Sequence, residues 1–268
     1  MVQTRFIRLF QFAVVAACCV ACSTSRVFAD IVTFDWATVG NPGNTGQGQS
    51  PGPFGAVSYN YRISKHEVTN EQYATFLNAV AATDSNGLYH TFMGSDVRGG
   101  ITRSGPSGSY TYSTKTNMGN KPVNYVSFFD AMRFTNWLEN GQGAGNTEAG
   151  VYTIGNGLNE TRATGSRFFI TSEDEWYKAA YHKNDGVTGN YWFYPTSSDI
   201  FPMVAMADMF GNISNPGSNV VNHNRGADWN GLNGNVTTVG SALSTSPYGT
   251  LELPLLVFST VKCPCTPI

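Results

Sequence analysis

Turn-forming residues interrupt this chain so often that only short helices and strands fit between them. Its 268 residues include 29 glycines and 12 prolines, and charged residues make up only 13% of the total, about half the usual share. Such a composition is typical of a protein with long loops and few long surface helices. Because 41% of the residues are hydrophobic, one core of ordinary size can still form. We therefore expect one α+β domain with short strands, few helices and long loops.

The first 29 residues have the pattern of an export signal. Two arginines precede an apolar stretch at 9–22 that is too short to span a bilayer, and Ala29 offers a small residue at the cleavage position. We interpret residues 1–29 as a signal peptide and expect an extracytoplasmic protein, secreted or periplasmic. A second interpretation takes Cys18 as the lipidated residue of a lipoprotein signal. No later stretch of the sequence is long and apolar enough for a transmembrane helix.

The charge of the chain argues against a nucleic-acid partner, and its few cysteines argue against a fold held by disulfide bonds. Removal of residues 1–29 takes away three arginines and no acidic residue, which moves the formal net charge from −2 to −5. Since the sequence also has no basic run, we expect no nucleic-acid partner. Beyond the export segment the only cysteines are Cys263 and Cys265. The body of the fold therefore cannot depend on disulfide bonds.

Three helices are predicted by one start signal, a hydroxyl residue followed three positions later by Gln, Asp or Glu. In this capping box the hydroxyl accepts a bond from a free backbone N–H, and the later side chain reaches back to the first residue. The pairs are Thr69 with Gln72, Ser127 with Asp130, and Ser172 with Glu175. Apolar residues at helical spacing follow each pair. The acidic residues at 173–175 are interpreted as charges that favour a helix N-terminus rather than as a catalytic carboxylate pair.

Strands are predicted where apolar and polar residues alternate. Residues 57–64 alternate strictly, which marks a half-buried strand. Shorter candidates lie at 109–113, 151–154 and 167–170. The segment at 30–54 ends in a run rich in Gly, Pro, Asn and Gln, so we interpret it as a lead-in loop.

Three segments resemble, in the right order, the family of formylglycine-generating enzymes, also called sulfatase-modifying factors. The first is similar to the family's E-V-T-N-x-x-Y motif, the second to P-V-x-x-V-S-W-x-D-A with a following W-L, and the third to L-P-[ST]-E-x-E-W-x-x-A-A. The matching residues are Glu67, Thr69, Asn70 and Tyr73, then Pro122, Val123, Asp130 and Trp137, and then Ser172, Glu175 and Trp176. Phe128 stands in place of the family's usual Trp, and Ile170-Thr171 stands in place of Leu-Pro.

The resemblance covers about residues 55–250 and implies a C-type-lectin-like fold, a compact α+β domain with little regular structure. It divides the chain into a signal peptide at 1–29, a lead-in segment at 30–54, the sulfatase-modifying-factor-like domain at 55–250 and an atypical tail at 251–268. The family's G-N-x-W-E-W and R-G-G-S segments do not follow Thr250. We therefore expect the domain to be incomplete, through a frameshift or a truncated gene near codon 250.

The tail also bears on catalysis. The resemblance implies that the family's enzymes oxidise a cysteine of a sulfatase to formylglycine, with a late cysteine pair that holds copper as thiolates. Here Cys263 and Cys265 flank a proline, their spacing is narrower than the family's, and no R-G-G-S precedes them. A disulfide at that spacing would be strained. We therefore predict no catalytic residue and expect no copper.

Calcium is the one ligand that the resemblance keeps open. Family members bind it through an asparagine side chain and backbone carbonyls in loops before the W-E-W segment, and Asn222, Asn233 and Asn235 match the first site. The alternative is that Asn-Gly at 233–234 simply forms a turn. The histidines are far apart in sequence and lack the spacing of a helical metal site. They are His66, His90, His182 and His223.

Two functions stay open from the sequence. The first is an exported, non-catalytic module that binds an unknown protein or glycan, or serves a structural role, through loops at 84–120 and 212–235. The second is a formylglycine-generating oxidase whose catalytic C-terminal part is missing from this chain. A non-functional product with uncovered apolar faces is a lesser alternative. We favour the first because the family's late thiolate pair is absent.

Overall fold

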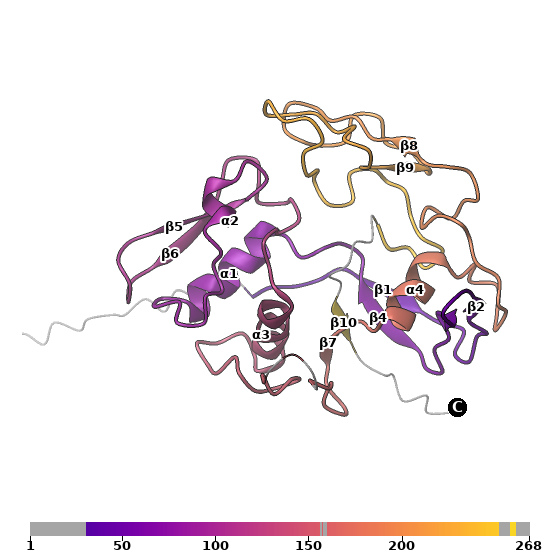
Figure 1. Cartoon of the computed structure of the whole chain (residues 1–268), viewed down its shortest axis with the longest axis horizontal. Helices are drawn as coiled ribbons and strands as arrows, with labels where there is room; N and C mark the ends of the chain where they lie inside the picture. The colour runs from indigo at the N-terminus through magenta and orange to yellow at the C-terminus, as the bar shows by residue number, and fades with distance from the viewer. Residues whose placement is uncertain (1–30, 156, 158–159, 252–257, 261–268) are drawn as a thin grey trace, which may run out of the picture.

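The structure is a computed structural model that describes residues 31–155, 157, 160–251 and 258–260 (Figure 1). The predicted signal peptide, Cys18 and the two cysteines of the tail lie outside the described residues. None of the helices in the described part of the chain has the length and apolar character needed to cross a bilayer.

Three helices begin at the capping boxes that the sequence predicts. They are α1 (Asn70–Val80), α3 (Phe128–Glu139) and α4 (Glu173–Tyr181), and both bonds of the box are formed in each. The boxes pair backbone donors of the first turn that would otherwise have no partner. A further helix, α2 (Phe92–Ser95), is a single turn without a side-chain cap. No capping pair marks α2 in the sequence, so it was not predicted.

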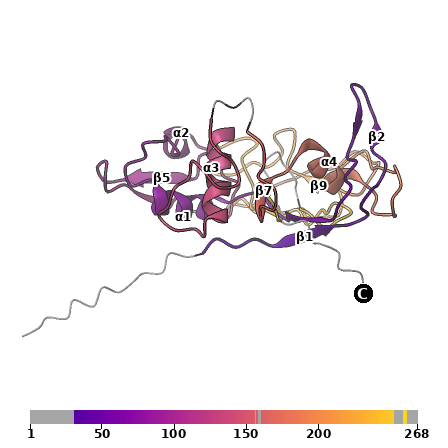
Figure 2. The same cartoon turned by 90° about the horizontal axis from the view of Figure 1, so that it is seen from below.

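The main sheet has four antiparallel strands in the order β1-β4-β10-β7. They are β1 (Trp36–Val39), β4 (Tyr61–Ser64), β10 (Phe258–Thr260) and β7 (Phe168–Ile170). The register places Ser259 between Ile63 and Phe169. The lead-in segment therefore contributes an edge strand rather than only a loop, and the tail contributes a central strand. In Figure 2, β1 runs along the lower edge of the molecule, and α2 and α3 lie higher and to its left.

Three short strand pairs lie outside the main sheet. They are β2 (Gln47–Gly48) with β3 (Pro53–Phe54), β5 (Ile101–Ser104) with β6 (Thr111–Thr114), and β8 (Met203–Val204) with β9 (Val220–Val221). The first two pairs are antiparallel and the third is parallel. Figure 1 shows β8 and β9 in a loop-rich region away from the main sheet. The mixture of short strands and few helices confirms the predicted α+β class; the C-type-lectin-like comparison stays a prediction.

Aromatic residues join α1 to α3. The ring centroids of Phe76 and Phe134 lie 5.2 Å apart and meet edge to face, and Trp137 lies 5.3 Å from Phe76. Tyr73 completes the group, and all four side chains are buried. Aromatic pairs in such geometry contribute about 0.5–1.5 kcal/mol beyond the area that they bury. The helical apolar faces predicted from spacing are confirmed here.

Two strand predictions differ from the structure, and side-chain hydrogen bonds explain both. In the predicted strand at 57–64, only 61–64 forms β4, because Val57 bonds to the side chain of Asn44 and to the backbone N–H of Gly43. No strand forms at 151–154. There the backbone N–H and C=O of Tyr152 both bond to the side-chain amide of Asn136, at 2.8 and 2.9 Å. The candidates at 109–113 and 167–170 correspond closely to β6 and β7.

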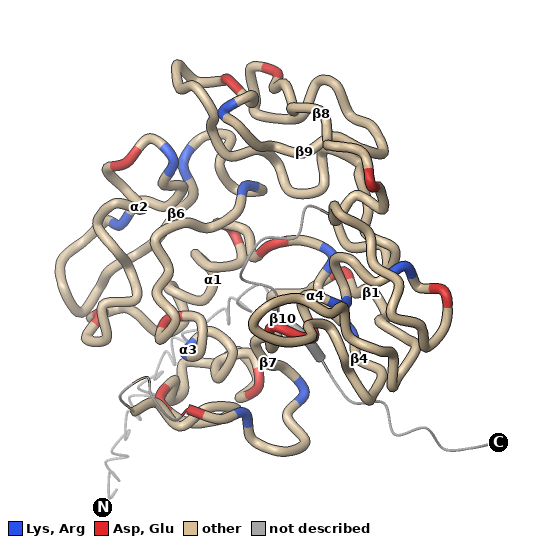
Figure 3. The backbone as a smooth tube through the Cα atoms, turned by 45° about the vertical axis from the view of Figure 1, so that its right-hand side comes forward, with Lys and Arg blue, Asp and Glu red and all other residues tan. Residues whose placement is uncertain are grey.

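Charged residues are sparse and mixed in sign over the described backbone (Figure 3). Two lysines are nevertheless buried. Lys178 of α4 donates from Nζ to the backbone oxygen of Asn41 at 2.8 Å, and Lys121 donates to the backbone oxygen of Phe210 at 2.9 Å. Each lysine therefore ties a loop to the body of the domain. Burial lowers the pKa of Lys178 to about 8 because desolvation disfavours the charged form.

Candidate functional site

A polar hollow lies between the end of α1 and the loop that follows α3, and we call it the α1–α3 pocket. Its volume is about 200 Å³, below the roughly 300 Å³ at which sites for drug-sized ligands begin. Two chain segments line it, with Val80, Asp84, Ser85, Asn86 and Leu88 from the first and Gly145, Asn146, Thr147 and Glu148 from the second. Most of these side chains are polar or charged. The pocket therefore suits a small hydrophilic ligand.

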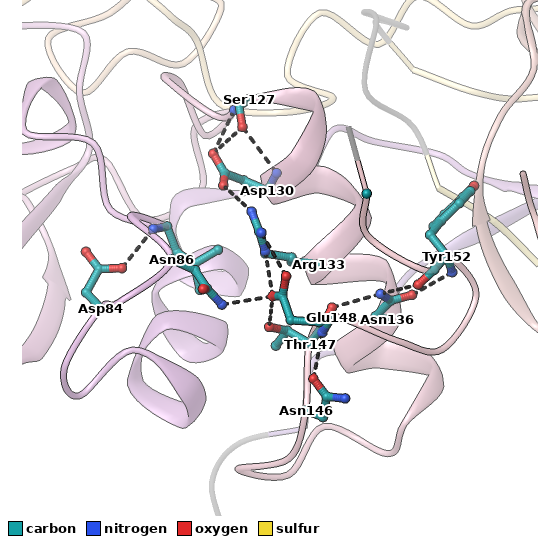
Figure 4. Close-up of polar contacts among 12 residues, drawn as sticks. Asp84, Asn86, Ser127, Asp130, Arg133, Asn136, Asn146, Thr147, Glu148 and Tyr152 are labelled. Carbon is teal, nitrogen blue, oxygen red and sulfur yellow. Dashed lines mark hydrogen bonds and ion pairs between the residues drawn. The ribbon is translucent and has the colours of Figure 1, made fainter. Parts of the chain in front are cut away.

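Glu148 is the fixed charge of the α1–α3 pocket (Figure 4). Arg133 of α3 donates from Nε to Glu148 Oε1 at 2.7 Å and from Nη2 to Oε2 at 2.8 Å. This two-point geometry orients the carboxylate as well as pairing its charge. Asn86 Nδ2 donates to the same Oε1 at 2.8 Å and joins the two lining segments. The bonds from Arg133 lower the pKa of Glu148, so the carboxylate is ionised at neutral pH.

The residues that cap the start of α3 contact Arg133, the partner of Glu148. Asp130 Oδ2 accepts a hydrogen bond from the hydroxyl of Ser127 at 2.7 Å, and Asp130 Oδ1 lies 3.9 Å from Arg133 Nη1. Figure 4 shows the series that runs from Ser127 through Asp130 and Arg133 to Glu148. Asp130, predicted as a family-motif residue, thus stabilises the helix start and also faces the arginine that fixes the pocket's carboxylate.

Asp84 shapes the first lining segment. Its side chain is only 4% exposed and accepts from the backbone N–H of Leu88 at 2.7 Å and from Arg103 Nη1 at 3.2 Å. Burial raises the pKa of Asp84 because the charged form loses solvation. The bond to Leu88 closes a turn whose tip, Ser85 and Asn86, is exposed at the pocket.

Asn136 of α3 and Asn140, the residue that caps the end of α3, hold the second lining segment. Asn136, which is fully buried, donates to the backbone oxygen of Thr147 at 2.8 Å as well as to that of Tyr152. Asn140, which is exposed, donates to the backbone oxygens of Asn146 and Ala149 at 3.0 and 2.9 Å. The loop is therefore held in place before any ligand arrives, which lowers the entropic cost of binding.

The pocket has polar atoms left over for a ligand. Among the described residues, no hydrogen bond involves Asn86 Oδ1, Asn146 Nδ2 or Ser85 Oγ. A ligand would therefore meet an acceptor, a donor and a hydroxyl beside the Glu148 carboxylate. Because its salt bridge lowers the pKa of Glu148, that carboxylate is a weak proton acceptor. The arrangement is suited to binding hydroxyl groups.

Five of the predicted family-motif residues lie around the start of α1, where they have structural roles. Asn70 Nδ2 donates to the backbone oxygens of Met118 and Lys121 at 2.9 and 3.1 Å. Thr69 and Pro122 form an isolated bridge, and Val123 donates its N–H to the backbone oxygen of Val68 at 2.9 Å. Glu67 is half-buried in the turn before α1, while Tyr73 and Trp137 belong to the aromatic core.

The third motif joins α4 to the main sheet. Glu175 is fully buried and accepts from Arg162 Nη1 at 3.0 Å and from the backbone N–H of Ser172 at 2.7 Å. It also accepts from the hydroxyl of Tyr59, which precedes β4. Trp176 is half-buried against the core between α4 and the sheet. These residues lie away from the α1–α3 pocket and hold the fold together.

The three asparagines predicted for calcium are close together, and the backbone oxygens of Asn233 and Asn235 accept hydrogen bonds. Asn222 Nδ2 donates to the backbone oxygen of Asn235 at 2.9 Å. Arg98 Nη2 donates to the backbone oxygens of Asn233 and Gly234, each at 3.2 Å. The guanidinium of Arg98 thus occupies two loop carbonyls, and its positive charge disfavours a second cation at the same oxygens. The calcium site stays a prediction.

The described part of the chain offers no cluster of side chains that could bind another metal ion. No group of three or more His, Cys, Asp or Glu side chains there lies close enough to hold a metal ion. His182, for example, is buried and bonds through Nδ1 to the hydroxyl of Tyr248 at 2.7 Å. The described residues contain no cysteine, so they do not fit the copper site that the family resemblance implies.

Part of the α1–α3 pocket was missed by reasoning from sequence. The predicted functional loop at 84–120 includes Asp84 and Asn86, and the Asp-Ser-Asn-Gly run there is a turn signal. Glu148 lies outside both predicted loops. Its partner Arg133 is fifteen residues earlier, on a helix face, and no local pattern marks two residues that meet across a loop.

The geometry defines an α+β domain with long loops and a small polar pocket between the end of α1 and the loop after α3. The family described as "Sulfatase-modifying factor enzyme 1-like domain" matches residues 40–250, which is more than half of the chain. The chain belongs to this family, and the resemblance drawn from its three motifs is confirmed. A solved structure titled "Crystal Structure of CarF" is similar with a TM-score of 0.40 and 17% identity, over 85% of this chain and 99% of that chain. No curated protein matches the chain significantly.

Proposed function

We propose that this chain is an exported, non-catalytic member of its family that binds a small hydroxyl-rich ligand in the α1–α3 pocket. A single sugar residue of a glycan is the ligand class that fits best. The observation that carries the proposal is the carboxylate of Glu148, fixed at two points by Arg133 and flanked by unengaged polar atoms of Asn86 and Asn146.

Sugar hydroxyls are both donors and acceptors, and the pocket offers partners for both roles. An ionised carboxylate accepts from a hydroxyl more strongly than a neutral group does. The side-chain amides of Asn86 and Asn146 supply one acceptor and one donor at fixed positions. Because the lining loops are held by buried bonds, little ordering is left to offset the binding free energy.

The test is binding of methyl pyranosides of glucose, galactose, mannose and N-acetylglucosamine, measured by titration calorimetry on the full chain. We expect at least one to bind, and Asn86→Ala to weaken that binding at least fivefold. Asn190→Ala is the matched control because the exposed Asn190 also donates from Nδ2 to a carboxylate, that of Asp185, at 2.8 Å. Binding that is equal in both variants would refute the assignment of the pocket.

Family membership supports one alternative, a formylglycine-generating oxidase. It is tested by mass spectrometry of a cysteine-containing sulfatase peptide after incubation with the protein and copper. We expect no conversion of the cysteine, and conversion would favour the oxidase. Export, which is supported by the pattern of residues 1–29, is tested by fractionating cells that express the full chain, with the protein expected outside the cytoplasm.

A further inference from the structure

The chain segment that contains β8 exposes six large apolar side chains, which we call the apolar strip. Its members are Ile200, Phe201, Met203, Met206, Met209 and Phe210, and each is between 50% and 76% exposed. No more than two residues separate successive members, so the strip is continuous along the chain. It lies in the loop-rich region of β8 and β9 (Figure 1). Exposed apolar residues are ordinary when they are scattered singly, but a run of six marks a contact surface.

The area of the apolar strip is that of a stable protein interface. A large apolar residue has an accessible area of about 200 Å², so the exposed fractions give the strip about 800 Å² in all. The largest apolar patch on a typical monomer is about 300–600 Å², whereas each partner in a stable complex buries about 800 Å². The strip is therefore large enough to hold two proteins together.

The backbone of β8 already has hydrogen-bond partners on both edges. On one edge, the N–H groups of Met203 and Ala205 donate to β9 and to the residue before it, each at 2.9 Å. On the other edge, Asn215 Nδ2 donates to the backbone oxygen of Val204 at 3.1 Å, and Asn215 Oδ1 accepts from the N–H of Met206 at 2.7 Å. An extended peptide therefore cannot add to β8 as a further strand, and a partner must contact the side chains of the strip.

Phe201 is held in position for such a contact. Its ring meets those of Tyr194 and His223 edge to face, with centroids 5.6 and 5.2 Å away, yet most of the residue is exposed. A ring that is fixed in advance loses little entropy on binding. The three methionines of the strip are flexible and can fit an irregular opposing surface. Aromatic residues and methionine are also enriched in protein interfaces.

The acidic residues of this segment have their partners within the chain. Asp199 Oδ2 lies 3.7 Å from Lys183 Nζ. Asp208 Oδ1 accepts from the backbone N–H groups of Phe210 and Asn212 at 2.9 and 2.8 Å. Neither carboxylate therefore needs a cation from another molecule, and no feature of the segment calls for a basic partner.

The charge of the segment also favours a second copy of the chain over a membrane as the occupant. Residues 195–211 contain no Lys or Arg, and the chain has a net charge of −2, whereas basic residues are what attract a protein to anionic lipids. A two-fold dimer requires a surface that is complementary to itself. The strip meets this requirement because its uncharged side chains can face their own copies without like-charge repulsion.

We propose that the apolar strip is the contact surface between two copies of this chain in a two-fold symmetric dimer. None of its residues lines the α1–α3 pocket, so the proposal goes beyond glycan binding and does not depend on it.

The test is sedimentation equilibrium of the full chain at concentrations up to about 100 µM, and we expect a dimer with a Kd in the micromolar range or tighter. Phe201→Lys and Met209→Lys each place a charge in the strip, and two-fold symmetry puts every substitution into the contact twice. We therefore expect each variant to weaken dimerisation by about tenfold or more. Val187→Lys is the matched control, because Val187 is 61% exposed and is not part of the strip.

Circular dichroism spectra equal to that of the wild type show that the variants are folded, as expected for substitutions of exposed side chains. A dimer that both strip variants weaken and the control does not would support the proposal. A monomer at every concentration, or a dimer that neither strip variant weakens, would overturn it. A monomer that sediments with phosphatidylcholine vesicles would also overturn it and would assign the strip to a membrane surface.

Discussion

Replacing Asn136 with leucine should destabilise the domain more than any exposed substitution near the pocket. The fully buried side chain makes three hydrogen bonds, to the oxygen of Thr147 and to both backbone groups of Tyr152, at 2.8 to 2.9 Å. Leucine has a similar size and makes none of them. Each buried backbone group left without a partner costs about 1–3 kcal/mol, and the added apolar burial offsets about 1–2 kcal/mol.

The three groups together cost about 3–9 kcal/mol, so after the offset the net loss for Asn136→Leu is about 4.5 kcal/mol at the middle of these ranges, which for a domain of this size lowers the melting temperature by about 9–18 °C. Asn140→Leu is the matched control because Asn140 holds the same loop from an exposed position. Water replaces its bonds, so we expect a loss of about 1 kcal/mol or less. Urea unfolding followed by tryptophan fluorescence measures both. Equal losses in the two variants, or a loss below 1 kcal/mol for Asn136→Leu, would refute this reasoning.

Three further predictions concern other parts of the molecule. The pKa of Lys178 is about 8 in the folded chain, against an ordinary value of 10.5. Between these two values the unfolded chain binds more protons than the folded chain, so the free energy of unfolding should rise from pH 8 to 10. Lys178→Met should flatten that rise in unfolding titrations. Gly211→Ala should destabilise by more than about 2 kcal/mol in the same assay, because its φ is +76° and a Cβ would lie 2.4 Å from Trp229. Gly231→Ala, with a φ of +71° and open space, should cost only about 1 kcal/mol, and equal costs would contradict the clash. Millimolar calcium should not change the melting temperature of the wild type, since Arg98 engages the loop carbonyls; a rise in melting temperature that is saturable in calcium would restore the calcium site.

Helix starts could be predicted from this sequence because the bonds that make them are local. Thr69, Ser127 and Ser172 each bond to a residue three positions away, so a short window contains the whole signal. The apolar faces of α1 and α3 follow from the same windows. The three motifs of the family are built on these helix starts, which is why family and fold class could be inferred together.

The sheet and the pocket depend on contacts that no short window contains. β1 pairs with β4 across the lead-in loop, and β10 lies between β4 and β7 although it comes from the tail. The predicted strand at 151–154 failed because a helix side chain, Asn136, took the place of a neighbouring strand. The pairing of Arg133 with Glu148 is likewise tertiary, so the charge at the centre of the candidate site had no signature of its own.

The most direct test of the proposed function is amide chemical-shift mapping of the isotopically labelled chain with the methyl pyranoside that binds most tightly. We predict that the shifts concentrate at 84–88 and 145–148, which line the α1–α3 pocket, and that the amide of Glu148 is among the largest. Shifts that leave both of these segments unchanged, or no shifts with any of the four sugars, would contradict the assignment of this chain as a glycan-binding member of its family.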